Sequence, residues 1–159
     1  MATASLNYSA WSALTITLAS LANGSWREST VVDNTTNKYT DVLLGGQIMP
    51  GTTPTVNTTI EVYLYALADG TVYTGGASGS DAAYTADGEE LLFPVAQIIQ
   101  VDATSDQGYV FGPISVAAAF GGVLPSKWGV VVKNASGAAL NATGGNHFIK
   151  YMGIKTDIV

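Results

Sequence analysis

The sequence predicts an all-β fold, an antiparallel β-sandwich that is jelly-roll-like and has about eight strands. Its composition is the first observation behind this prediction. The 159 residues are 47% hydrophobic but only 11% charged, so the polar surface consists mainly of neutral Thr, Ser, Asn and Gly. Threonine favours strands, whereas glycine and asparagine favour turns. The second observation is a series of short apolar segments of alternating polarity, separated by turn signals.

The first half of the chain supplies the clearest alternation. In "ALTITLASL", Leu14, Ile16 and Leu18 alternate with threonines, which predicts a half-buried strand. "SWRESTVVD" predicts a second extended stretch, and "KYTDVLLGGQIM" a strand interrupted at Gly45 and Gly46, where we expect a bulge or a corner. "TIEVYLYAL" predicts a strand whose second face is aromatic rather than charged, so we expect both of its faces to be covered. Its first face holds Ile60, Val62, Leu64 and Ala66.

The second half continues with a long loop and further strands. "DGTVYTGGASGSDAAYTADGEE" predicts a short strand around Val72 and then a loop rich in glycine and serine. "LLFPVAQIIQVDAT" predicts a strand that Pro94 marks as an edge or a bulge. "SVAAAF" is the one candidate for a helical turn, and the last strands are "QGYVFGPISV", "KWGVVVKN" and "HFIKYMGI".

The chain shows neither an internal repeat nor a linker. We therefore expect an N-terminal arm over residues 1–12 and a single β-sandwich domain over residues 13–159. The N-terminal stretch has no basic region followed by an apolar one, so no signal peptide is expected. With no cysteine in the sequence, disulfides and thiolate metal sites are excluded.

The charge balance argues against two classes of partner. The net charge is −6 at pH 7, and the six basic residues are too few to form the cationic stripe that phosphate backbones require. An anionic membrane surface is disfavoured for the same reason, and no apolar run approaches the roughly 18 residues of a membrane span. We expect neither nucleic acid nor membrane as a partner.

Catalytic signatures are weak, so no catalytic, cofactor-binding or metal-binding residue is predicted. His147 is the only histidine, and no Gly-x-Ser-x-Gly elbow accompanies it. One histidine falls short of a catalytic zinc site, which has two or three histidines as a rule. We expect His147 to be an ordinary strand residue. The protein is predicted not to be an enzyme.

The long loop concentrates carboxylates, which fit a solvated loop, a calcium site or a glycosidase pair. A solvated acidic loop is favoured over a calcium site or a glycosidase pair, because Ala83 stands two residues after Asp81, where an EF-hand needs an oxygen ligand. "GGASGSD" lacks the Lys-Ser/Thr of a phosphate loop. The tyrosines can stack on sugars, but cross-strand aromatic packing is favoured. The carboxylates are Asp81, Asp87, Glu89 and Glu90.

The only arginine of the chain, Arg27, lies in "NGSWREST" beside Trp26. Arginine and tryptophan are enriched at interface hot spots, so this pair is a candidate contact for a partner. In the alternative, Trp26 belongs to the core and Arg27 pairs with a nearby carboxylate at the surface. Adjacent strand residues face opposite ways, so the sequence leaves both interpretations open.

A resemblance points towards one class of protein. The segments "SWRESTVVDNTTNKYTDVLLGGQI", "TPTVNTTIEVYLYA" and "VDATSDQGYVFGPISVAAAFGGVLPSKWGVVVKNASGAALNATGGNHFIKYMGI" together resemble a group of small virion structural proteins of tailed bacteriophages. The resemblance covers residues 13–155 and rests on spaced Gly, Pro, Trp and Asn residues in a β framework. It carries no catalytic signature.

The resemblance implies a capsid decoration, or cement, protein that binds the outside of the head and stabilises contacts between major capsid protein subunits. It also implies a homodimer or homotrimer on the capsid surface of the virion, made in the host cytoplasm. The alternative is a phage tail or receptor-binding component that recognises a host surface glycan. The residues expected at the protein interface are Trp11, Trp26, Arg27, Glu28, Pro50 and Pro54.

Overall fold

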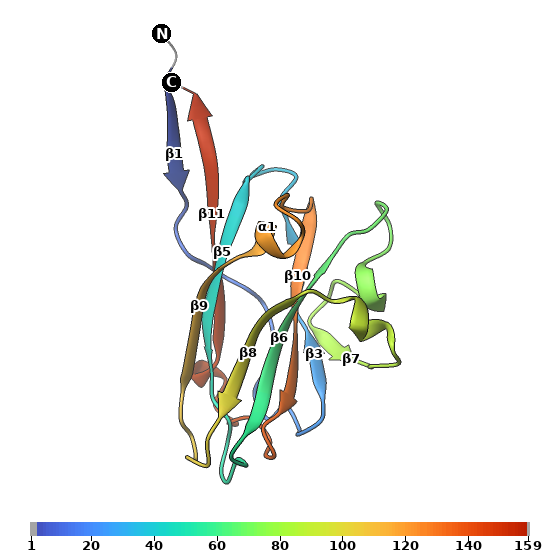
Figure 1. Ribbon diagram of the computed structural model, residues 1–159, viewed down its shortest axis with the longest axis vertical. Helices are drawn as coiled ribbons and strands as arrows, with labels where there is room; N and C mark the ends of the chain where they lie inside the picture. The colour runs from blue at the N-terminus through green and yellow to red at the C-terminus, as the bar shows by residue number, and fades with distance from the viewer. Residues whose placement is uncertain (1–2, 159) are drawn as a thin grey trace.

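The computed structural model describes residues 3–158, and the regular structure within them is mainly antiparallel β-strand (Figure 1). Within this range the only α-helix is α1 (Val116–Ala119), which confirms the helical turn expected in "SVAAAF". The side chain of Ser115 caps it by accepting a hydrogen bond of 3.0 Å from the Ala118 N–H. Short 3-10 turns complete the helical content: η1 (Thr74–Gly76), η2 (Glu89–Leu92) and η3 (Gly144–Asn146).

One sheet carries both ends of the described chain, and we call it the terminal sheet. Its strands follow the order β1–β11–β5–β9, and β2 pairs with β11 beside β1. All of these pairs are antiparallel. The bounds are β1 (Ala4–Tyr8), β2 (Ser12–Ala13), β5 (Asp41–Ile48), β9 (Tyr109–Ser115) and β11 (Phe148–Ile158).

The other sheet has part of its outer face covered by the chain, and we call it the covered sheet. Its strands follow the order β7–β3–β10–β6–β8, and β4 pairs with β10 beyond β3. These pairs are also antiparallel. The bounds are β3 (Trp26–Glu28), β4 (Val32–Asp33), β6 (Thr58–Ala66), β7 (Ala82–Tyr84), β8 (Val95–Val101) and β10 (Lys127–Ala135).

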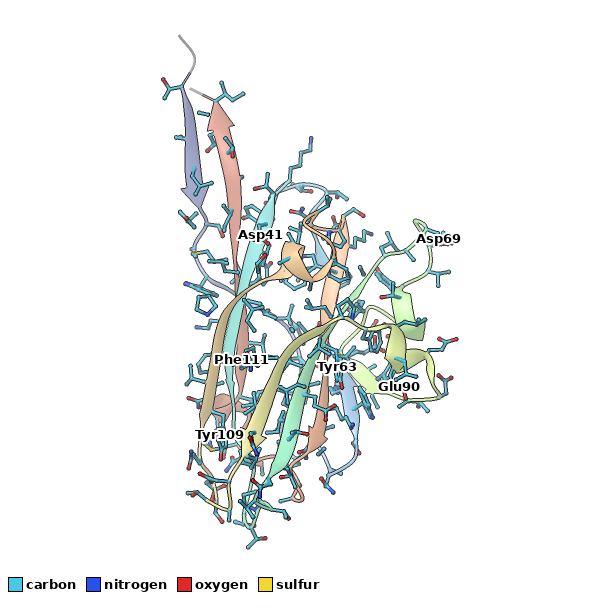
Figure 2. The ribbon with its side chains drawn as sticks, viewed as in Figure 1. Asp41, Tyr63, Asp69, Glu90, Tyr109 and Phe111 are labelled. Atoms are coloured by element: carbon cyan, nitrogen blue, oxygen red, sulfur yellow. The ribbon has the colours of Figure 1, made fainter. Side chains whose placement is uncertain are left out.

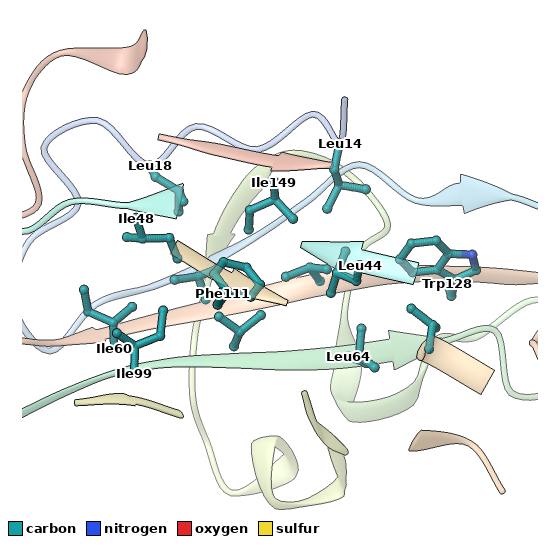
Figure 3. Packing of buried hydrophobic residues seen from close by; sticks show 14 of the residues in the cluster. Leu14, Leu18, Leu44, Ile48, Ile60, Leu64, Ile99, Phe111, Trp128 and Ile149 are labelled. Atoms are coloured by element: carbon teal, nitrogen blue, oxygen red, sulfur yellow. The ribbon is translucent and has the colours of Figure 1, made fainter. Parts of the chain in front are cut away.

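A single large hydrophobic cluster joins the inner faces of the two sheets (Figure 3). Leu44 and Ile48 contribute from the terminal sheet, while Val62 and Trp128 contribute from the covered sheet, and all four have no exposed surface. Side chains alternate across a strand, so every second residue of β5 and β6 enters this core. The inner face predicted for "TIEVYLYAL" is therefore confirmed.

The strand expected over residues 14–18 is not present. Leu14 N–H bonds to the Ile149 carbonyl of the terminal sheet at 2.8 Å, whereas Thr15 accepts a bond of 2.9 Å from the Thr30 N–H beside the covered sheet. The segment thus crosses from one sheet to the other and cannot form a ladder with either. The burial predicted by the alternation is nevertheless present, because Leu14 and Leu18 lie in the core and Ile16 is half-buried against it.

Two expected irregularities are confirmed. The pairing of β5 with β9 shifts register between Leu44 and Gly46, at the glycine pair of "VLLGGQI". A Cβ on Gly46 would lie 2.3 Å from the Phe148 carbonyl oxygen, so a larger residue cannot be accommodated without moving the backbone. Pro94 immediately precedes β8, which is the last strand in the order of the covered sheet.

The end of β11 and the whole of β1 form a two-stranded extension, which we call the terminal ribbon. It consists of β1 paired with Ile154–Ile158 of β11. Neighbouring β5 begins only at Asp41, which is opposite Ile154, so the ribbon extends beyond the rest of the sheet (Figures 1 and 2). The arm expected over residues 1–12 thus contains β1 and the first residue of β2, and residues 1–2 lie outside the description.

The segment between β6 and β8, residues 67–94, folds over the outer face of the covered sheet, and we call it the excursion. It contains η1, β7 and η2 rather than a strand at Val72, which lies next to an isolated bridge between Leu67 and Tyr73. Beneath it lies a second hydrophobic cluster, so the aromatic face of β6 is covered, as expected. This cluster comprises Tyr65, Ala77, Tyr84, Phe93 and Val131.

Candidate docking face

The outer side of the terminal sheet has no comparable cover. Along β11, Ile149 and Tyr151 point inward, where Ile149 is buried and Tyr151 packs edge-on against Trp128 at 5.6 Å between ring centroids. Phe148 and Lys150 point the opposite way and are exposed. Part of the covered sheet is therefore shielded by the excursion, while the terminal sheet presents its outer side chains to solvent.

Exposed apolar side chains gather on this outer side. Each is between 42% and 78% exposed. Exposed apolar groups that lie together mark interaction surfaces more often than isolated ones do. We call this surface the open face, and its exposed apolar residues are Leu6, Tyr8, Trp11, Val110, Phe148 and Ile158.

Trp11 lies at the centre of the open face, across Gly45 of β5. A Cβ on Gly45 would lie 3.8 Å from the Trp11 ring, which is an ordinary van der Waals separation, so the indole lies directly against this strand. Trp11, Val110 and Phe148 line a shallow depression of about 230 Å³. Enclosed sites for small molecules have larger volumes, about 300–1,000 Å³. The depression suits a single side chain of a docking partner.

The open face carries little charge. Lys150 is a cation within it, and its ammonium group lies 5.5 Å from the centroid of the Phe148 ring. Such a contact lets the lysine keep its charge while its carbon chain adds to the apolar surface. A partner therefore meets a mainly neutral surface, on a molecule whose net charge is −6.

The terminal ribbon is amphipathic, and its apolar side continues the open face. Directly paired residues lie on one side of a sheet, so Leu6 and Tyr8 share their side with Ile154 and Ile158. The opposite side of the ribbon is polar. There Asn7 donates a hydrogen bond of 2.8 Å to Asp157, and Lys155 lies 3.3 Å from the same carboxylate. The hydrogen bond from Asn7, with help from Lys155, holds the pKa of Asp157 below its usual value.

A second exposed apolar group lies over β8 and η2, on the side of the covered sheet. Leu91, Leu92, Val95 and Ile98 are between 51% and 85% exposed. Beside them is an aromatic recess of about 310 Å³. The residues that line it come from β3, β6, β8, β10 and the excursion, and they are Trp26, Tyr63, Glu90, Leu91, Phe93, Val95 and Lys133.

The recess combines aromatic rings with charged groups. Trp26 stacks on Tyr63 with ring centroids 5.4 Å apart, and Lys133 lies 5.1 Å from the Trp26 centroid. Burial opposes ionisation of Glu61, but hydrogen bonds from Tyr63, Thr59 and Lys133 lower its pKa overall. Burial and the neighbouring Glu61 raise the pKa of Tyr63, so its hydroxyl remains a donor near neutral pH.

The six residues expected at an interface do not share one surface. Trp11 is on the open face and Trp26 is on the opposite side of the molecule, in the aromatic recess. Glu28 is buried, where Ser78 donates to it through its N–H and its hydroxyl, both at 2.7 Å. Pro50 and Pro54 are buried in the loop between β5 and β6.

Arg27 holds the excursion against β3. Its Nε donates to Asp81 Oδ1 at 2.6 Å, and a terminal nitrogen donates to the Asp81 carbonyl at 3.0 Å. Thr17 adds bonds to the same carboxylate from its N–H and its hydroxyl, at 3.0 and 2.6 Å. Burial alone would raise the pKa of Asp81, but these bonds lower it overall. Of the two interpretations left open for Arg27, the geometry matches pairing with a carboxylate.

The remaining candidates for chemistry have structural contacts. His147 Nδ1 accepts from the Met49 N–H at 3.3 Å, and its Nε2 lies 2.8 Å from the Asn141 carbonyl, so both ring nitrogens face backbone groups. Over residues 3–158, no three His, Cys, Asp or Glu side chains come together as metal ligands would. No helix in the same range is long and apolar enough to span a membrane.

Most of the open face was not anticipated from the sequence. The signal was available in "HFIKYMGI", where Phe148, Tyr151 and Met152 place apolar groups on both faces of one strand, as in a strand covered on both sides.

A comparison with protein-family models finds no match for the chain, and a comparison with curated proteins finds none either.

Proposed function

We propose that this chain is a bacteriophage capsid decoration, or cement, protein, which binds the outside of the head and stabilises contacts between major capsid protein subunits. The observation that carries the proposal is the open face. The excursion shields part of the outer side of the covered sheet, whereas the terminal sheet has no such cover and leaves apolar groups exposed along its outer side. Such a rigid, unshielded surface suits permanent docking better than catalysis.

The fold class proposed is a jelly-roll-like β-sandwich. With β1 and β2 counted as one strand, β3 and β4 as another, and β7 as part of the excursion, the chain has eight successive strands in its sheets. The first, eighth, third and sixth then lie side by side in the terminal sheet, and the second, seventh, fourth and fifth in the covered sheet. This alternation supports two interlocked Greek keys, an architecture found in viral capsid domains.

The proposed mechanism is mechanical. Each copy buries its open face across a seam between capsid subunits, so separating the subunits re-exposes apolar surface to water. If the protein binds the expanded shell better than its precursor, binding stabilises the expanded state by linkage. Many copies on one lattice add avidity to each contact. In this proposal the protein is made in the host cytoplasm, assembles as a homodimer or homotrimer, and binds at the capsid surface of the virion.

The test is co-sedimentation of the purified protein with heads that lack it, before and after expansion. Saturable binding to expanded heads, with a higher temperature for DNA release, is the expected result. Trp11→Ser and Val110→Ser are expected to weaken binding at least tenfold, because both side chains line the depression on the open face. The matched control is Leu91→Ser, which changes another exposed apolar residue, on the other side of the molecule. Absence of binding to either form of the head would overturn the proposal.

A second candidate function is favoured by the aromatic recess. A tail or receptor-binding component would bind host glycans there, with sugar rings against Trp26 and Tyr63 and hydroxyls bonded to Glu90 and Lys133. Binding to host lipopolysaccharide or cell-wall sugars that Tyr63→Ala abolishes, together with no binding to heads, would replace the cement proposal with this one.

A further inference from the structure

The outer edge of β1 has backbone groups free for a further strand. Ser9 N–H bonds to the Gly153 carbonyl at 2.9 Å, whereas the Ile154 carbonyl accepts from Thr40 N–H on the side of β5. Backbone direction alternates along an antiparallel pair, so Ser5, Asn7 and Ser9 face β11. The intervening residues of β1 turn their N–H and C=O groups to the outer edge. These residues are Ala4, Leu6 and Tyr8.

The other edge strands of the described chain are protected, and β1 is not. Proteins blunt exposed edges with short strands, prolines, charges and bulges. Strand β7 has only three residues. Strand β8 follows Pro94 and pairs with β6 through a register shift. Strand β9 contains Pro113 and pairs with β5 through another register shift. The β1 sequence "ASLNY" holds no proline, glycine or charge, and all of its residues are exposed. The outer edge of β1 is therefore suited to pairing with a further β-strand.

We propose that β1 pairs edge to edge with β1 of a second copy of this chain, antiparallel and about a two-fold axis at Leu6. The two terminal ribbons then form one four-stranded sheet. This inference deepens the proposed function, because it names the contact that makes the homo-oligomer. It rests on the strand edge alone, so it is testable without any capsid.

The register supports a second copy as the occupant. With Leu6 opposite Leu6 of the second copy, Ala4 lies opposite Tyr8, and the outward groups of the two strands make about six hydrogen bonds. The side chains of these residues stay on the apolar side of the joined ribbons. A two-fold axis produces such self-complementary contacts, in which each residue pair occurs twice.

Charge also favours this pairing. On the polar side, Asn7 pairs with Lys155 and Ser5 pairs with Asp157 within each copy. With Leu6 opposite Leu6, Asn7 lies opposite Ser5 of the second copy. Residues that line up across the four strands therefore run from Lys155 of one copy to Asp157 of the other. No row therefore brings like charges together. The ribbons project from the bodies, so the two bodies, each with a net charge of −6, lie at opposite ends of the joined sheet.

Pairing also removes a weakness of the ribbon. A two-stranded sheet is only marginally stable in water, whereas three or more strands with a hydrophobic face hold together. The ribbon has only β11 to support β1, and Leu6, at 58% exposure, gains little burial there. A four-stranded platform covers the outer edge of each β1 and widens the apolar surface that the open face offers to the shell.

The experiment is sedimentation velocity on the full chain from micromolar to submillimolar concentration. The wild type is expected to dimerise reversibly. Leu6→Pro removes the outward N–H without touching a bond to β11, and it is expected to weaken dimerisation at least tenfold. Leu6→Thr keeps the N–H and a strand-forming side chain, so it should dimerise. Equal melting temperatures of the two variants verify that the body is folded. A monomeric wild type, or a Leu6→Pro variant that dimerises normally, would overturn the proposal.

A cross-link tests the axis itself. The chain has no cysteine, so Leu6→Cys introduces a single thiol. Hydrogen-bonded antiparallel neighbours have Cα atoms about 5.5 Å apart, which is within the range of a disulfide. Mild oxidation should give a covalent dimer at position 6 but none for Val123→Cys, which is also exposed and lies outside the ribbon. If neither variant cross-links while head binding persists, the strand pairing fails and the cement proposal stands.

Discussion

Replacing Arg27 by methionine is expected to destabilise the protein by loosening the excursion. Methionine keeps an apolar stem of similar length, so the change isolates the guanidinium. That group makes the two bonds to Asp81, which in turn is held by Thr17. The side chains of Arg27 and Asp81 are only 25% and 19% exposed, so water replaces the lost bonds poorly.

The magnitude follows from these contacts. A hydrogen bond to a charged group contributes about 1.5–3 kcal/mol, and removing Arg27 breaks one with the carboxylate and one with a neutral carbonyl. The bonds from Thr17 remain and retain part of the stabilisation of Asp81. We therefore expect the free energy of unfolding to fall by about 2–3 kcal/mol.

The assay is urea denaturation followed by circular dichroism, arranged as a double-mutant cycle with Asp81→Asn. A coupling energy of about 1–2 kcal/mol between the two positions is expected. Lys127→Met is the control, because its partner Asp33 lies 3.5 Å away and both side chains are more than a third exposed, so the midpoint should not move. An Arg27→Met variant as stable as the wild type but unable to bind heads would refute the reasoning and restore Arg27 as an interface residue.

Three further predictions concern the body of the protein. Gly129→Ala places a Cβ 2.2 Å from the buried Tyr65 ring, and overpacking there should cost about 1–3 kcal/mol in urea denaturation. Leu44→Ala leaves a cavity in the core between the sheets and should cost about 2–5 kcal/mol, measured in the same way. The folded state lowers the pKa of Asp81 below 3.8 and that of Glu61 below 4.5. The two carboxylates therefore contribute to the free energy of unfolding above those pH values, and this contribution is lost as pH falls further. Melting temperatures measured by calorimetry should decline from about pH 4.5 downwards, and less steeply in Asp81→Asn. A melting temperature that is flat over this range would contradict the last prediction.

Local pattern was enough for the core and for much of the strand content. The alternation in "TIEVYLYAL" identified the buried side of β6, and Gly45–Gly46 and Pro94 marked a bulge and an edge at the right places. Each of these signals acts within a few residues of the feature that it specifies. That is why one sequence suffices to read them.

The docking face depends on contacts distant in sequence, and so it was largely missed. Trp11 was a candidate, but Phe148 and Val110 join it only because β11 and β9 flank β5. The partner of Arg27 is 54 residues further along the chain, and nothing local in "NGSWREST" identifies Asp81. Pairings across such separations are set by the topology of the sheets, not by periodicity.

The pairing of Ala4 with Ile158 at the tip of the ribbon has a consequence for load. A force that pulls these two residues apart acts across the ladder rather than along it, because both stand at the same end of an antiparallel pair. The ribbon would then open like a zipper, one residue pair after another. A tether attached at this tip would yield at low force and leave the core between the sheets intact.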